Sequence, residues 1–467
     1  MSSRVTLHAA VDLGATSGRV VLGRVGPRGI QLSEVHRFPN GPVDLNGSLH
    51  WDAVGLYQQV LTALEMLPKG VASLGIDTWA IDYGLLDAHG DLLGVPYSYR
   101  DARTTPAIDK VHAVTSPEDL YAQHGLQFLP FTTLYQLAAA RGTPALEAAE
   151  TLLLMPDLMG FWLTGVRAAE ATNASTTGLF DTSQRAWSQS LADVAGIKRA
   201  LLPPLVQPGQ VAGPVRHQVR EQTRFTGQVV HVGSHDTASA YVATPFTSSR
   251  SIVISLGTWG LVGLETQAPI LSTAARSANF TNELGVDGQN RFLRNVAGLF
   301  LLTEVLAHWR FTLVDRERLL SEAADLQRGA TFDVDDPRLV APGNMPAKIA
   351  DVMQDGGWAP PRRKIFLVRA ILDSLAIKLA ATAREAARLA DVEPDVIHIV
   401  GGGVNNPLLC QLIADEAGLP VVAGPVEATS LGNLLVQARA AGSIEGELED
   451  MRDLVRHSFP SRTFQPR

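Results

Sequence analysis

Apolar residues recur at two different spacings along this chain, and the alternation of these spacings predicts its secondary structure. The run Val71–Asp77 has the length and apolar content of a buried strand. Just before it, Asp52–Leu67 has the period of one helix face. Its apolar positions are Val54, Tyr57, Val60, Leu61, Leu64 and Leu67. Because such strands and helices alternate along the chain, the pattern favours mixed α/β domains over an all-β protein or a helical bundle.

The same patterns predict further elements. We expect mostly helix over Tyr121–Ala149 and again over Leu152–Trp162, and one long helix from about Lys364 to Ala390. Val396–Val400 is typical of a strand, and three glycines follow it. Asn406 and Pro407 then open a helix that ends at Gly418, with Pro in the first turn and Gly past the end.

One strand, turn and strand pattern occurs twice, in Ala10–Arg19 and in Ile252–Gly260. In each copy a largely apolar run stops at a Gly, and hydroxyl residues follow whose backbone N–H groups can face an anion. Since a strand resumes after each turn, both are hairpins and not loops that enter a helix. One such hairpin is more often a plain turn. Its repetition predicts two similarly folded domains that bind one polyphosphate.

Asp12 strengthens the functional interpretation of the first hairpin. It lies among apolar neighbours where the strand meets the turn. A carboxylate is costly to bury there unless it has a partner such as a hydrated cation. The sequence therefore predicts a metal ion close to the phosphates.

The segment Val229–Ala240 is the most suggestive of chemistry, because a strand ends in Gly and a polar cluster opens an Ala-rich helix. Ser234 or Asp236 could simply cap that helix. Alternatively, Asp236 could accept a proton from a substrate hydroxyl during phosphoryl transfer. The residues alone leave both interpretations open. For the three glycines Gly401–Gly403, a plain turn and a site for the adenosine of a nucleotide are likewise both open.

Composition permits this chemistry and narrows the setting. The 467 residues are enough for about two domains, and 46% hydrophobic content supplies their cores. A net charge of −8 argues against a nucleic-acid surface. The single cysteine, Cys410, indicates a reducing compartment, and no apolar run of about 18 residues occurs. We therefore expect a soluble cytoplasmic protein with no membrane partner, with its linker at Thr244–Arg250.

Taken together, the motifs DLGATSGR, SHDTASA, SLGTWG and HIVGGG resemble those of the FGGY carbohydrate kinases, in the actin, hexokinase and Hsp70 superfamily. The resemblance spans nearly the whole chain. It implies two actin-like (ribonuclease H-like) α/β domains that flank a nucleotide and sugar cleft. Residues 1–243 would bind sugar and phosphate, and residues 244–467 would bind the nucleotide. The resemblance continues through the segments EVHRFPNG, GIDTWAIDYGLLD, YRDAR, GLQFLPFTTLYQL, LLMPDLMGFWLTG, TNASTTGL and AGPVEATSLGN.

These further segments are similar to those of family members that act on L-rhamnulose, so the resemblance implies ATP-dependent phosphorylation of its 1-hydroxyl in L-rhamnose breakdown. Another ketose such as L-fuculose or L-xylulose is the alternative, and an actin-like or Hsp70-like ATPase or a sugar sensor is less favoured. The partners would be a ketose and ATP, with Mg²⁺ as the metal.

The resemblance also implies roles for individual residues. Asp236 would be the proton acceptor, and Asp12 would hold Mg²⁺ through water. The ATP-binding positions would be Ala15, Thr16, Ser17, Gly18, Arg19, Thr258, Thr303 and Gly402. The sugar-binding positions would be Ala80, His235, Asp236, Thr237 and Asn295. Two positions depart from a related sequence, which has Gly where Ala80 stands and Gln where Thr303 stands.

Overall fold

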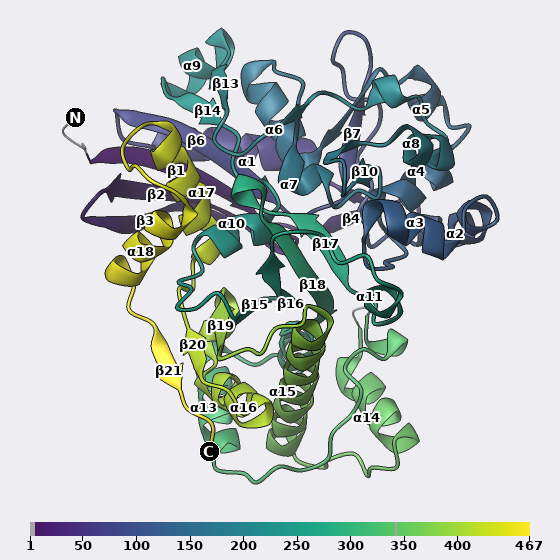
Figure 1. Cartoon of the computed structure of the whole chain (residues 1–467), viewed down its shortest axis with the longest axis vertical. Helices are drawn as coiled ribbons and strands as arrows, with labels where there is room; N and C mark the ends of the chain where they lie inside the picture. Colours follow the sequence, from purple (N-terminus) through teal and green to yellow (C-terminus); the bar gives the residue numbers. More distant parts are fainter. Residues whose placement is uncertain (1–4, 341–342) are drawn as a thin grey trace. The chain divides into compact units, whose positions relative to one another are not determined.

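The computed structural model describes residues 5–340 and 343–467, and it confirms the α/β class (Figure 1). The chain divides into two compact units. Unit 1 contains the chain up to Ala243 together with Glu265–Phe292 and Ala428–Ser458. Unit 2 contains Thr244–Leu264, Leu293–Glu427 and Phe459–Arg467. The boundary predicted between residues 243 and 244 is where unit 1 first gives way to unit 2, but two later segments return to unit 1.

Unit 1 is built on a six-stranded sheet with the order β13, β14, β6, β1, β2, β3. β6 is parallel to both β1 and β14, whereas β2, β3 and β13 are antiparallel to their neighbours. The carboxyl ends of β1, β6 and β14 therefore lie at one edge of the sheet. The strands are β1 Thr6–Leu13, β2 Ser17–Gly26, β3 Gly29–Pro39, β6 Val71–Thr78, β13 Val211–Pro214 and β14 Gln228–Val230.

The first predicted hairpin and the helix after it are confirmed. β1 and β2 pair from Thr6 and Val25 to Leu13 and Gly18. α1 spans Ala53–Met66, and the Asp52 side chain caps it by accepting a hydrogen bond from the backbone N–H of Gly55. The apolar face is rotated from the predicted one, because Val54 is 66% exposed while Leu56 is buried.

α17, Ala428–Ala440, comes from near the end of the chain and packs on the strands at its beginning (Figure 1). Glycines allow this close approach. A Cβ at Gly75 would lie 2.5 Å from Asn433 Oδ1, and one at Gly23 would lie 2.6 Å from a Leu434 methyl. A Cβ at Gly432 would lie 1.8 Å from the carbonyl oxygen of Ser239 in α10, Asp236–Val242.

The remainder of unit 1 confirms one prediction and corrects part of another. Residues 121–149 are mostly helical, as predicted, and the helical residues belong to three short helices. Leu152–Leu154 is strand, because this fully buried Leu run pairs antiparallel with β7, Tyr83–Leu86, and helix begins only at Met155. The remaining helices are α2 Thr105–His112, α3 Pro117–His124, α4 Thr133–Ala140, α5 Pro144–Ala148, α6 Met155–Thr164, α7 Ala171–Ala174, α8 Gln189–Ala195, α9 His217–Thr223, α11 Thr273–Ser277 and α18 Leu448–Ser458. The remaining strands are β4 Pro42–Leu45, β5 Ser48–Trp51, β7 Tyr83–Leu86, β8 Thr151–Leu154, β9 Ala169–Glu170, β10 Phe180–Asp181, β11 Ala186–Trp187, β12 Leu205–Val206 and β17 Thr281–Leu284.

Unit 2 contains the second predicted hairpin, in which β15 pairs antiparallel with β16, and β15 is parallel to β19. The predicted long helix, the strand before the glycines and the helix that Asn406 caps are all confirmed. The strands are β15 Ser251–Leu256, β16 Trp259–Thr266, β18 Asn290–Ala297, β19 Val396–Val400, β20 Val421–Ala423 and β21 Arg462–Phe464, and β16 and β18 continue into unit 1. The helices are α12 Phe300–His308, α13 Leu313–Ala324, α14 Met345–Asp355, α15 Lys364–Leu389 and α16 Pro407–Ala417.

Short 3₁₀ turns complete both units: Ala102–Thr104, Arg199–Leu201, Val286–Gly288, Pro337–Leu339 and Gly402–Asn405. Among the described residues, no helix is both long enough and apolar enough to cross a membrane.

Candidate active site

Three aspartates come together at the carboxyl edge of the unit 1 sheet. Asp12 and Asp77 are register partners on the parallel strands β1 and β6. The segment after β14 reaches the same edge, where His235 forms a parallel bridge with Thr78, and Asp236 follows it. Parallel strands place their carboxyl ends together, and this topology therefore gathers carboxylates from distant parts of the sequence.

The carboxylates in this cluster affect one another electrostatically. Burial and the negative charge of Asp12 hold the pKa of Asp77 well above its ordinary value. Burial also raises the pKa of Asp236; His235 opposes this increase and Asp12 adds to it. Asp77 Oδ1 is buried and has no hydrogen-bond partner. Such an edge attracts protons or cations, although no group of three or more His, Cys, Asp or Glu within residues 5–340 and 343–467 is arranged to hold a metal ion.

Asp12 is tied to the first hairpin by its own turn. Arg19 donates two hydrogen bonds to Asp12 Oδ2, at 2.9 Å from Nε and 2.6 Å from Nη2, and Ser430 Oγ lies 3.4 Å from the same oxygen. The turn closes with a 2.9 Å bond from Gly14 N to the carbonyl of Ser17. Thr16 is exposed, and Ala15 and Ser17 are half-buried.

Gly18 is required for packing in this turn. A Cβ at Gly18 would lie 2.3 Å from the Phe38 ring, so no larger residue fits without a shift. The exposed tip of the turn can accept a ligand, while its base is fixed against the sheet.

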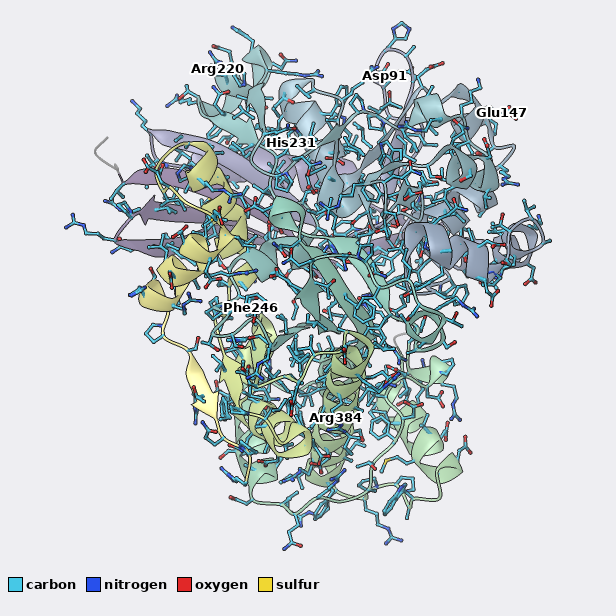
Figure 2. All side chains as sticks on the ribbon, viewed as in Figure 1. Asp91, Glu147, Arg220, His231, Phe246 and Arg384 are labelled. Carbon is cyan, nitrogen blue, oxygen red and sulfur yellow. The ribbon has the colours of Figure 1, made fainter. Side chains whose placement is uncertain are left out.

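The buried carboxylate of Glu170 holds the loop that precedes α10. His231, labelled in Figure 2, begins this loop after β14. Glu170 Oε2 accepts bonds from Ser234 N at 2.9 Å and from Ser234 Oγ at 2.7 Å. His235 is the residue that precedes α10, and its side chain makes no capping bond. The capping interpretation of Ser234 and Asp236 is therefore wrong, because Ser234 binds Glu170 and Asp236 is already the first helical residue.

Two neighbours contact the carboxylate of Asp236. Thr237 Oγ1 donates to Asp236 Oδ1 at 3.0 Å, and His235 Nε2 lies 3.3 Å from the same oxygen. The Asp236 side chain is 35% exposed, whereas the His235 side chain is 8% exposed. Asp236 is thus positioned by buried neighbours and remains open to a ligand.

Ala80 lies in a strained turn of the same unit. The next residue, Ile81, has a φ of +70°, which is costly for a β-branched side chain, and Thr133 Oγ1 donates to its carbonyl at 2.6 Å. Asp82 then accepts bonds from the indoles of Trp51 and Trp79. Backbone strain of this kind is concentrated at functional sites, which makes this turn a candidate binding element.

In unit 2, glycines surround the second hairpin. A Cβ at Gly298 would lie 2.5 Å from Trp259 C and 2.6 Å from Thr258 O, so the backbone after β18 packs directly on the hairpin turn. Gly401, with a φ of +85°, follows β19 beside the carbonyl of Leu256. A Cβ at Gly402 would meet nothing within 4 Å, so the chain is open on that side.

The other predicted unit 2 residues lie on or near the same elements. Thr303 is exposed on α12, and its backbone N–H donates to Leu299 O at 2.9 Å. Asn295 is half-buried on β18. The predicted residues thus fall into two sets: Asp12, Ala15–Arg19, Ala80 and His235–Thr237 in unit 1, and Thr258, Asn295, Thr303 and Gly402 in unit 2.

Sequence reasoning missed several residues around these aspartates. Asn433 Nδ2 donates to Asp77 Oδ2 at 2.6 Å, and Glu170 holds Ser234. Glu283 Oε2 lies 3.3 Å from His235 Nδ1, and Arg291 contacts both. Asp77 and Asn433 fall inside segments that carry the family resemblance, but only the fold brings them to the site.

Both halves of the chain match models of one family. Residues 8–243 match the N-terminal domain of the FGGY family of carbohydrate kinases, and residues 252–441 match its C-terminal domain. The chain belongs to the FGGY family of carbohydrate kinases, so it is a sugar kinase that uses ATP as its cosubstrate.

Relatives that are similar along nearly the whole chain share one name. The rhamnulokinase of Pectobacterium atrosepticum is 39% identical over 98% of this chain and 92% of its own length. The rhamnulokinase of Oceanobacillus iheyensis is 37% identical over 98% of both chains. Among solved structures, ligand-bound xylulose kinase from Lactobacillus acidophilus has a TM-score of 0.80 at 16% identity, covering 99% of this chain and 94% of that one. These structures confirm the two-domain fold of the family.

Proposed function

We propose that this protein transfers the γ-phosphoryl group of ATP to the 1-hydroxyl of L-rhamnulose, giving L-rhamnulose 1-phosphate and ADP, as a step in L-rhamnose breakdown. The observation that carries the substrate is the similarity along 98% of the chain to relatives named rhamnulokinase, at 37–39% identity for the two described above. The xylulose kinase structure, at 16% identity, supports the fold and does not identify the sugar.

Asp236 is the proposed general base. It takes the proton of the O1 hydroxyl as O1 forms its bond to the γ-phosphorus and the bond from that phosphorus to the β-γ bridging oxygen of ATP breaks. Its partly exposed carboxylate and raised pKa suit a proton acceptor. Contacts from His235 and Thr237 to one oxygen restrict its rotation.

The proposed phosphate contacts are the backbone of Ala15–Gly18 with the Arg19 side chain in unit 1, and Thr258 in unit 2. Gly402 and Thr303 are proposed to contact the nucleotide. The open side of Gly402 and the exposure of Thr303 support these roles. The related sequence has a Gln at this position. Because the Thr303 side chain is shorter than that of Gln, it reaches less far toward the nucleotide.

The residues at the unit 1 edge fit a divalent cation, with Asp12 as the proposed holder through water. The unpartnered Asp77 oxygen and the mutual repulsion of the carboxylates are both relieved by added positive charge. Mg²⁺ bound there would neutralise phosphate charge. Arg19 binds one oxygen of Asp12, and the other oxygen is the proposed contact to the hydrated ion.

Ala80, His235, Thr237 and Asn295 are the proposed sugar contacts. A site that bonds each hydroxyl rejects an isomer that leaves its polar atoms unpaired. Ala80 is the sugar-binding position at which we expect a substitution to alter the preference among ketoses, because its methyl replaces the hydrogen of a Gly in a related sequence. We further propose that the protein works in the cytoplasm, where its cosubstrate ATP is available.

A substrate panel tests the proposal. Purified protein is assayed for ADP release with L-rhamnulose, L-fuculose, L-xylulose, D-xylulose and glycerol, and L-rhamnulose is expected to give the highest kcat/KM. Ala80→Gly should change the ranking of ketoses more than the KM for ATP. If D-xylulose or glycerol is the best acceptor by a wide margin, the sugar assignment is wrong. Equal ATP turnover with and without any ketose would favour the ATPase alternative.

A further inference from the structure

His235 lies in a buried cluster that continues away from Asp236. Its Nε2 atom is 3.3 Å from Asp236 Oδ1. Its Nδ1 atom is 3.3 Å from Glu283 Oε2 and 3.2 Å from Arg291 Nη2. Both ring nitrogens are therefore in contact with charged groups, and the ring connects the partly exposed Asp236 to a buried ion pair.

Glu283 and Arg291 form that ion pair across a hairpin. Glu283 is on β17 and Arg291 is on β18, and Arg291 Nη2 is 3.2 Å from Glu283 Oε2. The side chains of Arg291 and Glu283 are 0% and 7% exposed. All four residues of the cluster belong to unit 1, although Glu283 and Arg291 come from the half of the chain that the sequence assigned to the other domain.

The positive charge of Arg291 stabilises the ionised form of Glu283. Burial would raise the pKa of Glu283, but Arg291 and His235 outweigh this and lower it. Arg291 also donates from Nε and Nη2 to the carbonyl of Leu284, at 3.3 and 3.1 Å. That carbonyl is fixed to the backbone, so Arg291 ties Glu283 and His235 to the β17–β18 hairpin. Burying two charges is costly, and such pairs are often neutral or unfavourable for stability.

We propose that Glu283 and Arg291 are positioning residues for phosphoryl transfer. They fix the His235 ring so that Nε2 faces Asp236 Oδ1, and His235 in turn fixes the carboxylate that receives the proton. This inference rests on the proposed role of Asp236 as the base. Besides His235, the groups that act on Asp236 include Thr237, which donates to Oδ1, and the charges of Asp12 and Asp77.

The test is a double-mutant cycle between Glu283 and His235. Glu283→Gln keeps the size of the side chain and an acceptor oxygen but removes the charge. We expect kcat with L-rhamnulose to fall about 10-fold or more, as for a displaced catalytic group, while the KM for ATP stays within about 2-fold. In a His235→Asn background the same change should lower kcat by less than about 2-fold, because Glu283 acts through the imidazole.

A control in the same hairpin separates positioning from stability. Asp287 forms an ion pair with Arg439, with two distances of 2.6 Å, and does not contact His235. Asp287→Asn should leave kcat within about 2-fold of the wild type while losing an ion pair of the same hairpin that is more exposed than the pair of Glu283 and Arg291. Thermal melting of every variant shows whether it folds. If Glu283→Gln does not fold, Arg291→Lys serves instead. Lys keeps the positive charge but lacks the guanidinium group that contacts both the Leu284 carbonyl and His235.

Two outcomes would overturn the inference. One is a Glu283→Gln kcat within 2-fold of the wild type; the other is an equal loss in both backgrounds, which means that Glu283 acts independently of His235. Asp236→Asn distinguishes these from failure of the proposed function. If Asp236→Asn is nearly inactive and Glu283→Gln is normal, only the positioning role is wrong. If Asp236→Asn turns over normally, the base assignment itself is wrong.

Discussion

The hairpin β1–β2 in unit 1 and the hairpin β15–β16 in unit 2 share one backbone pattern but have different surroundings. Beside the first are Asp12 with its Arg19 partner and the buried Asp77. Around the second are the backbones of Gly298 and Gly401, and Thr258 in its turn. A repeated turn therefore does not repeat its chemistry. The charged edge suits proton and cation binding, whereas the glycine-lined edge suits close approach of a ligand to the backbone.

The strongest test of this difference removes the base from the charged edge. Asp236→Asn keeps the shape of the side chain and can still contact His235 and Thr237, but it cannot accept the proton. We expect kcat to fall roughly 10²-fold or more with little change in sugar affinity, measured by steady-state kinetics and by calorimetry. Near-normal turnover would exclude Asp236 as the base.

A second test concerns the cation. Asp12→Ala should raise the Mg²⁺ concentration for half-maximal rate by about 10-fold to 100-fold, as for an outer ligand of a metal, and should affect ketose binding less. Titration of Mg²⁺ at saturating ATP measures this. Ser430→Ala is the matched control, since it removes only the 3.4 Å contact to Asp12 and should shift the midpoint by less than about 3-fold. An unchanged midpoint in Asp12→Ala would return Asp12 to a structural role.

The glycine-lined edge has its own test. Gly298→Ala forces a Cβ into the backbone of Thr258 and Trp259 and should displace the hairpin turn. The KM for ATP should rise about 10-fold, because small displacements of a binding group are costly, while sugar affinity is retained. Gly329→Ala in the same unit is the control, as its Cβ would meet nothing within 4 Å. A normal KM for ATP in Gly298→Ala would argue against phosphate binding by this turn.

The smallest effect lies at the other end of β1, where burial lowers the pKa of His8 to about 4. The ordinary value is 6.5, so the unfolded chain gains a proton first as the pH falls. His8 therefore contributes stability above pH 6.5 that is lost toward pH 4. Between pH 7 and pH 5 the loss is about 2 kcal/mol.

Replacing His8 tests that contribution. His8→Asn should reduce the loss of unfolding free energy over this range by that amount, measured by urea denaturation. Equal pH dependence in His8→Asn and wild type would contradict the assignment.

Local sequence patterns predicted those helices and strands whose structure does not depend on contacts with distant parts of the chain. The hairpins, α1, α15 and α16 follow from periodicity, from Asn406 and from the glycines. The prediction was wrong at Leu152–Leu154, because a short apolar run fits a strand or a helix, and only pairing with β7 decides between them.

The site was predicted only in part for a similar reason. Asp12 and Asp236 lie in recognisable motifs, so both could be named as candidates from the sequence, but the role of Asp236 as a base came from the family resemblance and not from its neighbours alone. Glu283 and Arg291 acquire meaning only when the β17–β18 hairpin lies beside His235, and this proximity is a property of the tertiary structure.

The position of α17 has a consequence for how the protein is made. During synthesis the strands of the unit 1 sheet leave the ribosome long before Ala428–Ala440 exists. Until then Gly75 and Gly23 have no helix against them, and the nascent sheet carries an uncovered face. Domains often fold in order as they emerge, and exposed apolar surface invites aggregation. Unit 1 can be completed only after Ala428–Ser458 has been translated. The strands near the start of the chain therefore cannot reach their final packing before that point.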